Sequence, residues 1–204
     1  YNIMEPTRRY VDPDNSCLFS SVGYNLDHRN FSDITSLQYR QLLAQYLEAN
    51  EIDKNLLEIP KNKYIEEIEN PSTWGGAVEL KLFSDMFQIE IASIDVQSNR
   101  VDIFGQDKKY PQRIYLLYNG VHYDPLVFAN SESPKDDITV FESDDHETLI
   151  QMQDYCKIFK KNGDYVDISK MNTLKCTDCN QMFESQEEAM VHAHNFNHYN
   201  FDQV

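Results

Sequence analysis

"DPDNSCLFSSVGYNL", residues 12–26, places a turn directly before a cysteine and an apolar, periodic run directly after it. Every residue from 12 to 16 is a turn-forming or helix-capping type. From Leu18 the apolar residues recur at helical spacing, which predicts that Cys17 lies at a helix N-terminus. There, unpaired N–H groups and the positive end of the helix dipole favour a thiolate. A cysteine in such a place is more often a small buried residue, so Cys17 needs a partner elsewhere in the chain to act as a nucleophile.

"LLYNGVHYDPLVF", residues 116–128, offers that partner. Residues two apart in a strand share a face, so His122 and Asp124 are expected to point the same way. We expect Asp124 to hold the Nδ1–H of His122 and to leave Nε2 free to take a proton from Cys17. The alternative is an ordinary strand end with a surface His and Asp. An early cysteine followed by His-x-Asp on a later strand gives nucleophile, base and orienter in papain-like chain order.

The hydrophobic pattern changes along the chain from helical to strand-like. Helical spacing predicts helices over residues 32–50, 62–70 and 77–87, the first with Ser32 as N-cap. Its expected buried stripe comprises Leu37, Leu43, Tyr46 and Leu47. Alternation and β-branched residues predict later strands over 90–96, 101–105, 113–119 and 122–128, after a short first strand in 8–14. This order predicts an α/β (α+β) domain with a central sheet flanked by helices, over residues 1–130.

Residues 130–147 carry a strong acidic excess, which is typical of a linker or a mobile surface loop. One more helical pattern follows over 147–162. We therefore assign residues 131–173 to an acidic linker and helix, and residues 174–204 to a small separate module.

Composition excludes several classes of function. The 204 residues carry 18 Lys and Arg against 34 Asp and Glu, a formal net charge of −16, which argues against non-specific nucleic-acid binding and against anionic membranes. Four cysteines do not make a disulfide framework in a chain of this length, which favours a reducing compartment. Neither a membrane span nor a signal peptide is visible. Because the chain begins at Tyr1 rather than Met, we expect a fragment of a longer protein.

The last segment has zinc-finger spacing. Two residues separate Cys176 from Cys179, twelve separate Cys179 from His192, and five separate His192 from His198. His194 competes as a ligand, but with only one residue between it and His192 it suits helical geometry poorly. The expected result is a small ββα zinc finger in which zinc is structural, because so short a module lacks a sufficient core without metal.

Two further residues bear on this finger. Phe183 occupies the expected core aromatic position, whereas Ala189 stands where a larger aliphatic residue is usual. The helix before the histidines reads ESQEEAMV, without Lys or Arg, so DNA phosphate contact is not expected. A finger that binds protein, or its own chain, is the better interpretation.

Three motifs stand in order: DNSCLF (14–19), WGGAVEL (74–80) and GVHYDP (120–125). Together they resemble the ovarian-tumour (OTU) family of deubiquitinating cysteine proteases, over roughly residues 5–128. The chain is most similar to the ubiquitin thioesterase branch, whose members end in a zinc finger. The resemblance implies a papain-like OTU cysteine protease domain followed by that finger.

By this resemblance, Cys17 is the nucleophile and His122 the general base and acid. Asp124 and Asp14 compete for the third role, because some members place the orienting residue in the loop before the cysteine. Asp14 would in either case brace the turn whose backbone N–H groups form the oxyanion hole. We favour Asp124 because the strand gives it a direct route to the imidazole.

The resemblance also places substrate-binding residues. Trp74, Gly75 and Gly76 are expected near the site, and Gly120 and Val121 in the loop that carries the histidine. Ubiquitin ends in two glycines preceded by an arginine-containing segment, so its tail needs a narrow channel with an acidic approach. Small residues would let that backbone pass closely. The alternative is a core tryptophan beside a glycine turn.

The activity implied is that of a thiol-dependent ubiquitin isopeptidase, cleaving after the C-terminal glycine of ubiquitin or within polyubiquitin chains. Catalysis needs no cofactor. Family members act in protein quality control and ER-associated degradation, and an N-terminal domain absent from this chain docks them on a ubiquitin-selective AAA ATPase segregase. We expect a cytoplasmic location, and also a nuclear one, with neither nucleic-acid nor membrane partners. A catalytically silent ubiquitin-binding adaptor is the alternative, and the intact Cys17, His122 and Asp124 speak against it.

Overall fold

The computed structural model describes residues 3–27, 33–130, 133–167 and 174–203. The chain forms two compact units, an N-terminal unit (Tyr1–Asp164) and a C-terminal unit (Tyr165–Val204). The expected N-cap Ser32 lies outside the described residues. Among the described residues, no helix combines the length and apolar character that crossing a bilayer requires.

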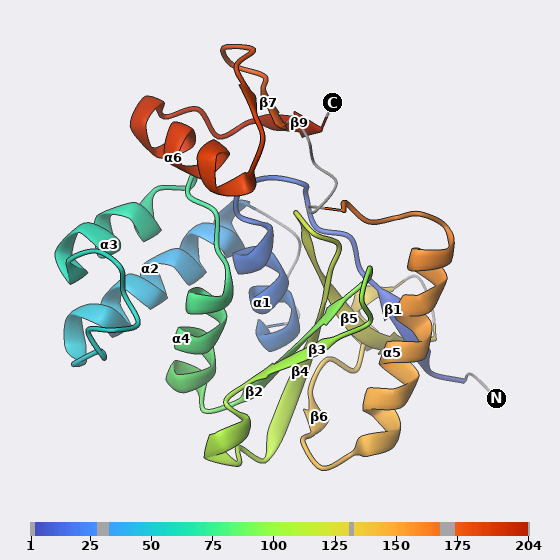
Figure 1. Cartoon of the computed structure of the whole chain (residues 1–204). Helices are drawn as coiled ribbons and strands as arrows, with labels where there is room; N and C mark the ends of the chain where they lie inside the picture. Colours follow the sequence, from blue (N-terminus) through green and yellow to red (C-terminus); the bar gives the residue numbers. More distant parts are fainter. Residues whose placement is uncertain (1–2, 28–32, 131–132, 168–173, 204) are drawn as a thin grey trace. The chain divides into compact units, whose positions relative to one another are not determined.

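A mixed six-stranded sheet forms the middle of the N-terminal unit (Figure 1). Its strands are β1 (Glu5–Arg8), β2 (Glu90–Asp95), β3 (Val101–Phe104), β4 (Gln112–Tyr118), β5 (Tyr123–Ala129) and β6 (Phe141–Glu142). The order is β1-β5-β4-β2-β3, with β6 paired to β4. Only the β2–β4 pair is parallel among these described strands. The antiparallel β4–β5 hairpin sets Leu117 opposite Asp124.

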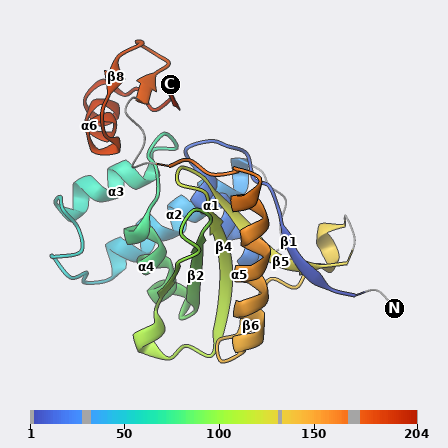
Figure 2. The same cartoon turned by 45° about the vertical axis from the view of Figure 1, so that its right-hand side comes forward.

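Helices cover both faces of this sheet. They are α1 (Cys17–Asp27), α2 (Asp33–Ala49), α3 (Lys61–Glu69), α4 (Ala77–Phe87) and α5 (His146–Lys161), with short 3-10 turns at Gln106–Lys108 and Pro134–Asp136. Helices α1, α2 and α4 lie on one side and α5 on the other (Figures 1 and 2). The expected α/β architecture of a central sheet flanked by helices is confirmed.

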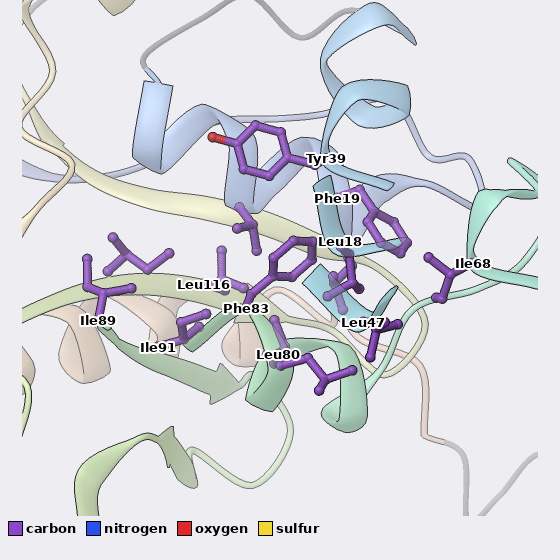
Figure 3. Packing of buried hydrophobic residues seen from close by; sticks show 14 residues of the cluster. Leu18, Phe19, Tyr39, Leu47, Ile68, Leu80, Phe83, Ile89, Ile91 and Leu116 are labelled. Atoms are coloured by element: carbon purple, nitrogen blue, oxygen red, sulfur yellow. The ribbon is translucent and has the colours of Figure 1, made fainter. Parts of the chain in front are cut away.

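The core lies between the sheet and the first helices (Figure 3). Leu18 and Phe19 of α1 pack there with Phe83 of α4 and with strand residues such as Ile91 and Leu116. Phe19 meets Phe83 edge to face, with ring centroids 5.8 Å apart. Every residue of α1 from 17 to 25 is buried, so the helix that starts at the cysteine is held on all sides.

The buried stripe of α2 differs from the predicted one. Leu43 and Leu47 are fully buried, but Leu37 is 44% exposed and Tyr46 is half-buried. Tyr39 and Arg40 face the core instead. The hydrophobic pattern could not show this, because it counts Arg40 as polar and therefore assigns it to the exposed face of the helix. The observed buried face is rotated toward Arg40.

The assignment of residues 131–173 to a linker and helix requires correction. The N-terminal unit extends to Asp164, so residues up to there belong to its fold rather than to a connection. Asp137 is fully buried and accepts hydrogen bonds from Arg9 (Nη2–Oδ1, 2.7 Å) and from the hydroxyl of Tyr24. Ile138 bridges to Phe128 of β5. An acidic composition predicts a solvated segment only where the fold offers its carboxylates no arginine partner.

The first strand also ends earlier than residues 8–14 suggested, at Arg8. Beyond it, the chain leaves the sheet toward the turn before α1.

The C-terminal unit contains β7 (Leu174–Cys176), β8 (Met182–Phe183), α6 (Gln186–Phe196) and β9 (Phe201–Gln203), with sheet order β8-β7-β9. Ser185 caps α6 by accepting from the N–H of Glu188 at 3.1 Å. The predicted ββα finger therefore carries one further strand. Phe201 of that strand packs edge to face on Phe183 at 5.9 Å, which supplies the apolar volume that the small Ala189 does not.

Candidate active site

Cys17 is the first residue of α1 and is 7% exposed. The loop before it is tied by its own carboxylate, since Asp14 Oδ1 accepts from the N–H of Ser16 at 2.8 Å. The carbonyl oxygen of Asp14 also accepts from the N–H of Cys17 at 3.3 Å. These contacts turn the chain sharply into the helix, as the cluster of turn residues in the sequence predicts.

His122 lies in the loop of the hairpin between β4 and β5. The side chain of Asn119 holds this loop. Asn119 Oδ1 accepts from the N–H of His122 at 2.9 Å and from that of Val121 at 3.2 Å. Gly120 has φ of 106°, a conformation that glycine adopts without strain. The sequence predicts only a turn at Asn119-Gly120. In the structure, the Asn119 side chain also holds the backbone of the histidine loop.

The three residues meet at one point. His122 Nε2 lies 2.9 Å from Asp124 Oδ1, and the N–H of Tyr123 donates to Cys17 Sγ at 3.5 Å. Burial lowers the pKa of His122, but hydrogen bonds with Asp124 and Cys17 raise it more, to about 10. A protonated imidazole between a carboxylate and a thiol stabilises a thiolate–imidazolium pair.

The nitrogen assignment expected from the sequence is wrong. Asp124 binds Nε2, not Nδ1. The thiol lies against the backbone of the next residue, Tyr123. With Nε2 bound to the carboxylate, Nδ1 is the ring nitrogen left to exchange a proton with Cys17.

Asp124 is fully buried and its oxygens have further donors. Oδ1 also accepts from the N–H of Val11 at 2.9 Å, and Oδ2 accepts from Arg8 Nε at 2.8 Å. Asp14, by contrast, is exposed and its carboxylate is engaged within its own loop. The geometry thus gives Asp124 the contact with the imidazole and Asp14 the contact with the Cys17 loop.

Arg8 was not found from the sequence. It is buried, donates through Nη1 to Asp164 at 2.6 Å, and lies over the rings of Tyr10 and Phe159 at 4.5 and 4.8 Å. Its backbone N–H donates to the hydroxyl of Tyr155 in α5. An arginine near the end of an N-terminal strand carries no signal of this role, because both carboxylates it binds are more than a hundred positions away.

The Trp74-Gly75-Gly76 segment lies against the Cys17 loop. Trp74 Nε1 donates to Asn15 Oδ1. A Cβ on Gly75 would come within 3.1 Å of the Leu18 side chain, so a glycine allows close approach to α1. The N–H of Gly76 donates to Glu79 Oε2 at 2.6 Å at the start of α4.

The remaining substrate candidates lie in the histidine loop. Val121 is 38% exposed beside His122, and Gly120 is buried with its carbonyl oxygen accepting from the Tyr118 hydroxyl at 2.5 Å. A role in substrate binding for these residues and for 74–76 stays a prediction.

The C-terminal unit brings its four predicted ligands together. The ligand atoms of Cys176, Cys179, His192 and His198 all lie within 4.8 Å of one another. Cys179 Sγ is 3.4 Å and His198 Nδ1 is 3.3 Å from His192 Nε2. Two thiolates and two imidazoles at such separations suit a tetrahedral zinc ion, whose ligand bonds measure about 2.0–2.3 Å. His194 is exposed and is not among these ligands.

Comparison with known families agrees with both units. Residues 12–135 match the OTU-like cysteine protease family. Residues 171–204 match the C-terminal C2H2-type zinc finger of ubiquitin thioesterase OTU1.

Individual relatives extend this likeness over the whole chain. Ubiquitin thioesterase OTU1 of Dictyostelium discoideum is 37% identical over 199 residues, covering 96% of this chain and 60% of that protein. OVARIAN TUMOR DOMAIN-containing deubiquitinating enzyme 2 of Arabidopsis thaliana is 31% identical over 204 residues, covering 96% of both. The chain thus spans only about 60% of the length of the first of these relatives.

A solved OTU domain in complex with ubiquitin superposes with a TM-score of 0.66 at 25% identity, covering 79% of this chain and 90% of that one. The matched family region contains the cysteine loop, the glycine segment and the histidine hairpin. The chain therefore belongs to the OTU family of cysteine proteases.

Proposed function

We propose that this chain is the catalytic part of a deubiquitinase that hydrolyses the isopeptide bond after the C-terminal glycine of ubiquitin. The observation that carries the proposal is the contact series from Cys17 through His122 to Asp124. It is supported by the solved OTU domain of similar structure, which is in complex with ubiquitin.

The reaction follows from that contact series. The Cys17 thiolate attacks the carbonyl carbon of the terminal glycine, and backbone N–H groups of the Cys17 loop stabilise the oxyanion. His122 gives its proton to the departing lysine amine, which leaves a thioester between Cys17 and ubiquitin. His122 then takes a proton from water, which attacks the thioester and releases the ubiquitin carboxylate and the thiol.

The substrate channel is proposed to pass between Trp74-Gly75-Gly76 and the Gly120-Val121 loop. Glycines in both segments leave room for a tail that itself ends in two glycines. The net charge of −16 favours the arginines that precede that tail.

Zinc in the C-terminal unit is proposed to be structural. Cys176, Cys179, His192 and His198 would hold it, and the catalytic residues lie in the other unit. Zinc would supply folding free energy to a unit of about 40 residues with a small core.

Wider roles are proposed from family membership alone. They are a function in protein quality control and ER-associated degradation, docking of the whole protein on a ubiquitin-selective AAA ATPase segregase through a further N-terminal domain, and a cytoplasmic and nuclear location. Nucleic acid is not a proposed partner, because the acidic finger opposes phosphate contact.

The decisive experiment is covalent capture by ubiquitin that carries a C-terminal electrophile. The chain is expected to gain the mass of one ubiquitin at Cys17, and Cys17→Ala is expected to gain none. A second arm measures release of a fluorophore from ubiquitin at its C-terminus. Binding of ubiquitin without capture or release by the wild-type chain would instead identify a silent adaptor.

A further inference from the structure

Arg40 of α2 is completely buried in the N-terminal unit, at a core position where an apolar residue is the ordinary choice. Burial lowers its pKa to about 10, and the charges of Asp14 and Glu79 oppose this change, so the guanidinium stays charged at neutral pH. A buried cation is a poor device for stability alone, since well-packed apolar replacements of buried charges are often neutral or stabilising. The role of Arg40 is therefore sought in the groups that accept its hydrogen bonds.

The guanidinium of Arg40 donates to oxygen atoms of two separate loops and of the end of α3. Asn15 and Ser16, in the loop before Cys17, accept from Nη2 at 3.0 and 2.9 Å. In the second loop, the carbonyl oxygens of Thr73 and Pro71 accept from Nη2 at 2.6 and 3.2 Å. The carbonyl oxygen of Ile68, in the last turn of α3, accepts from Nη1 at 2.9 Å. The guanidinium also lies over the ring of Phe19, 4.0 Å from its centroid.

The peptide between Asn15 and Ser16 is held at both ends. Arg40 binds its carbonyl oxygen, and Asp14 Oδ1 accepts from its N–H. Since this peptide directly precedes Cys17, its orientation sets the direction in which the loop N–H groups point. Neither contact touches the thiol or the imidazole.

The two loops are also joined to each other around Arg40. The Ser16 hydroxyl donates to the carbonyl oxygen of Pro71 at 3.2 Å, and Trp74 Nε1 donates to Asn15 Oδ1. The second loop leads directly into Trp74-Gly75-Gly76. One side chain thus links the nucleophile's loop to the glycine segment.

We propose that Arg40 is a positioning residue that holds the Asn15–Ser16 and Pro71–Thr73 loops in the relative arrangement that a ubiquitin tail needs to reach Cys17. The inference rests on the proposed function at Cys17. It assigns Arg40 no contact with the reacting atoms. Its loss should therefore impair reactions that use the channel and the oxyanion loop more than it impairs alkylation of the thiol, whose thiolate form the Arg40 charge also favours.

The test compares two rate constants at Cys17 on the full chain. One is capture by ubiquitin with a C-terminal vinyl methyl ester, which needs both loops. The other is alkylation by iodoacetamide, which needs only the thiolate. The ratio of the first to the second is expected to fall about 10- to 100-fold in Arg40→Met, the scale of a misplaced reacting geometry. Arg40→Lys keeps the charge but reaches fewer carbonyls, and is expected to fall less.

Arg113→Met is the matched control. Arg113 is also a buried arginine, bound to Glu90 at 2.6 Å, but it lies at the far end of β4 from the His122 hairpin, about 16 Å away by strand rise. Its loss is expected to lower thermal stability and to leave the ratio at the wild-type value. A ratio that falls equally in both variants would reduce Arg40 to a residue of general stability.

Ser16→Ala decides the matter if Arg40→Met does not fold. It removes the hydroxyl between Arg40 and Pro71 but keeps the guanidinium, and the ratio is expected to fall several-fold. Wild-type ratios in both Ser16→Ala and Arg40→Lys would overturn the inference. Failure of the wild-type chain itself to react with the ubiquitin probe would instead refute the proposed function, and this inference with it.

Discussion

Two buried cysteines of the N-terminal unit differ in what surrounds their sulfur atoms. Cys17 lies at a helix start beside His122, whereas burial in α5 raises the pKa of Cys156 to about 12. Cys17→Ala is therefore expected to abolish hydrolysis of a ubiquitin–fluorophore reporter, and Cys156→Ala to leave it nearly intact. Iodoacetamide at pH 7 should label Cys17 and spare Cys156. Equal loss of hydrolysis in both folded variants would contradict the assignment of the nucleophile.

The two aspartates near the site are expected to act in different ways. Asp124→Asn keeps one acceptor oxygen, replaces the other with an NH2 donor, and removes the charge that raises the pKa of His122. The pKa of His122 then falls, so the imidazolium that stabilises the Cys17 thiolate is lost at a lower pH. The pH at which Cys17 alkylation reaches half its maximal rate should therefore rise. Turnover should fall, by up to ~10⁴ on the scale of a comparable serine-protease change, and by less where an Asn serves in this role.

Asp14→Ala is the contrasting variant. It removes the acceptor for the Ser16 N–H and loosens the oxyanion loop, so turnover should fall by ~10²–10³. The pH dependence of alkylation should stay in place, because the imidazole keeps its carboxylate. If Asp14→Ala moves the alkylation profile and Asp124→Asn does not, the two roles are reversed.

At the residue scale, sequence reasoning worked where chemistry and local geometry coincide. Cys17 followed from its turn, and the shared face of His122 and Asp124 from strand alternation. The choice of imidazole nitrogen did not follow, because strand alternation does not fix the orientation of the imidazole ring. The roles of Arg8 and Arg40 could not be predicted either, because their hydrogen-bond acceptors lie in distant or irregular segments.

At the scale of elements, α5 and the strand before it belong to the fold of the N-terminal unit. Asp137 neutralises Arg9, and Asp164 binds Arg8, which in turn holds Asp124. A chain ending at residue 130 is therefore expected to lack a cooperative thermal transition and reporter hydrolysis. A chain ending at residue 167 should retain both. Circular dichroism melting and the ubiquitin reporter check this, and a folded, active 1–130 fragment would contradict it.

Most helices and strands followed from periodicity, because each buries one apolar face against the same sheet. The expected spans 77–87 and 90–96 agree closely with α4 and β2. The acidic stretch before α5 did not follow, because composition alone does not reveal that the buried Asp137 meets Arg9. The rotated face of α2 has the same origin, since Arg40 counts as polar in any hydrophobic pattern.

At the scale of the whole molecule, the two units should lose structure independently. A chelator that removes zinc takes away the metal that joins the four ligands, Cys176, Cys179, His192 and His198. It should therefore unfold the C-terminal unit, whose core is small. Metal analysis of fresh protein should give about one zinc per chain. Hydrolysis of the minimal ubiquitin reporter should persist after chelation, because the catalytic residues lie in the N-terminal unit. Absence of zinc from fresh protein would contradict the site.

The pairing of β1 with β5 joins Arg8 to Leu126, and the same arginine bonds Asp164. These contacts close loops of more than a hundred residues, which are entropically costly and slow to form. During synthesis, the nucleophile leaves the ribosome long before its base, and the base before the residues that brace its carboxylate. The contacts that hold Asp124 through Arg8 are therefore expected to be incomplete in a nascent chain until Asp164 has emerged.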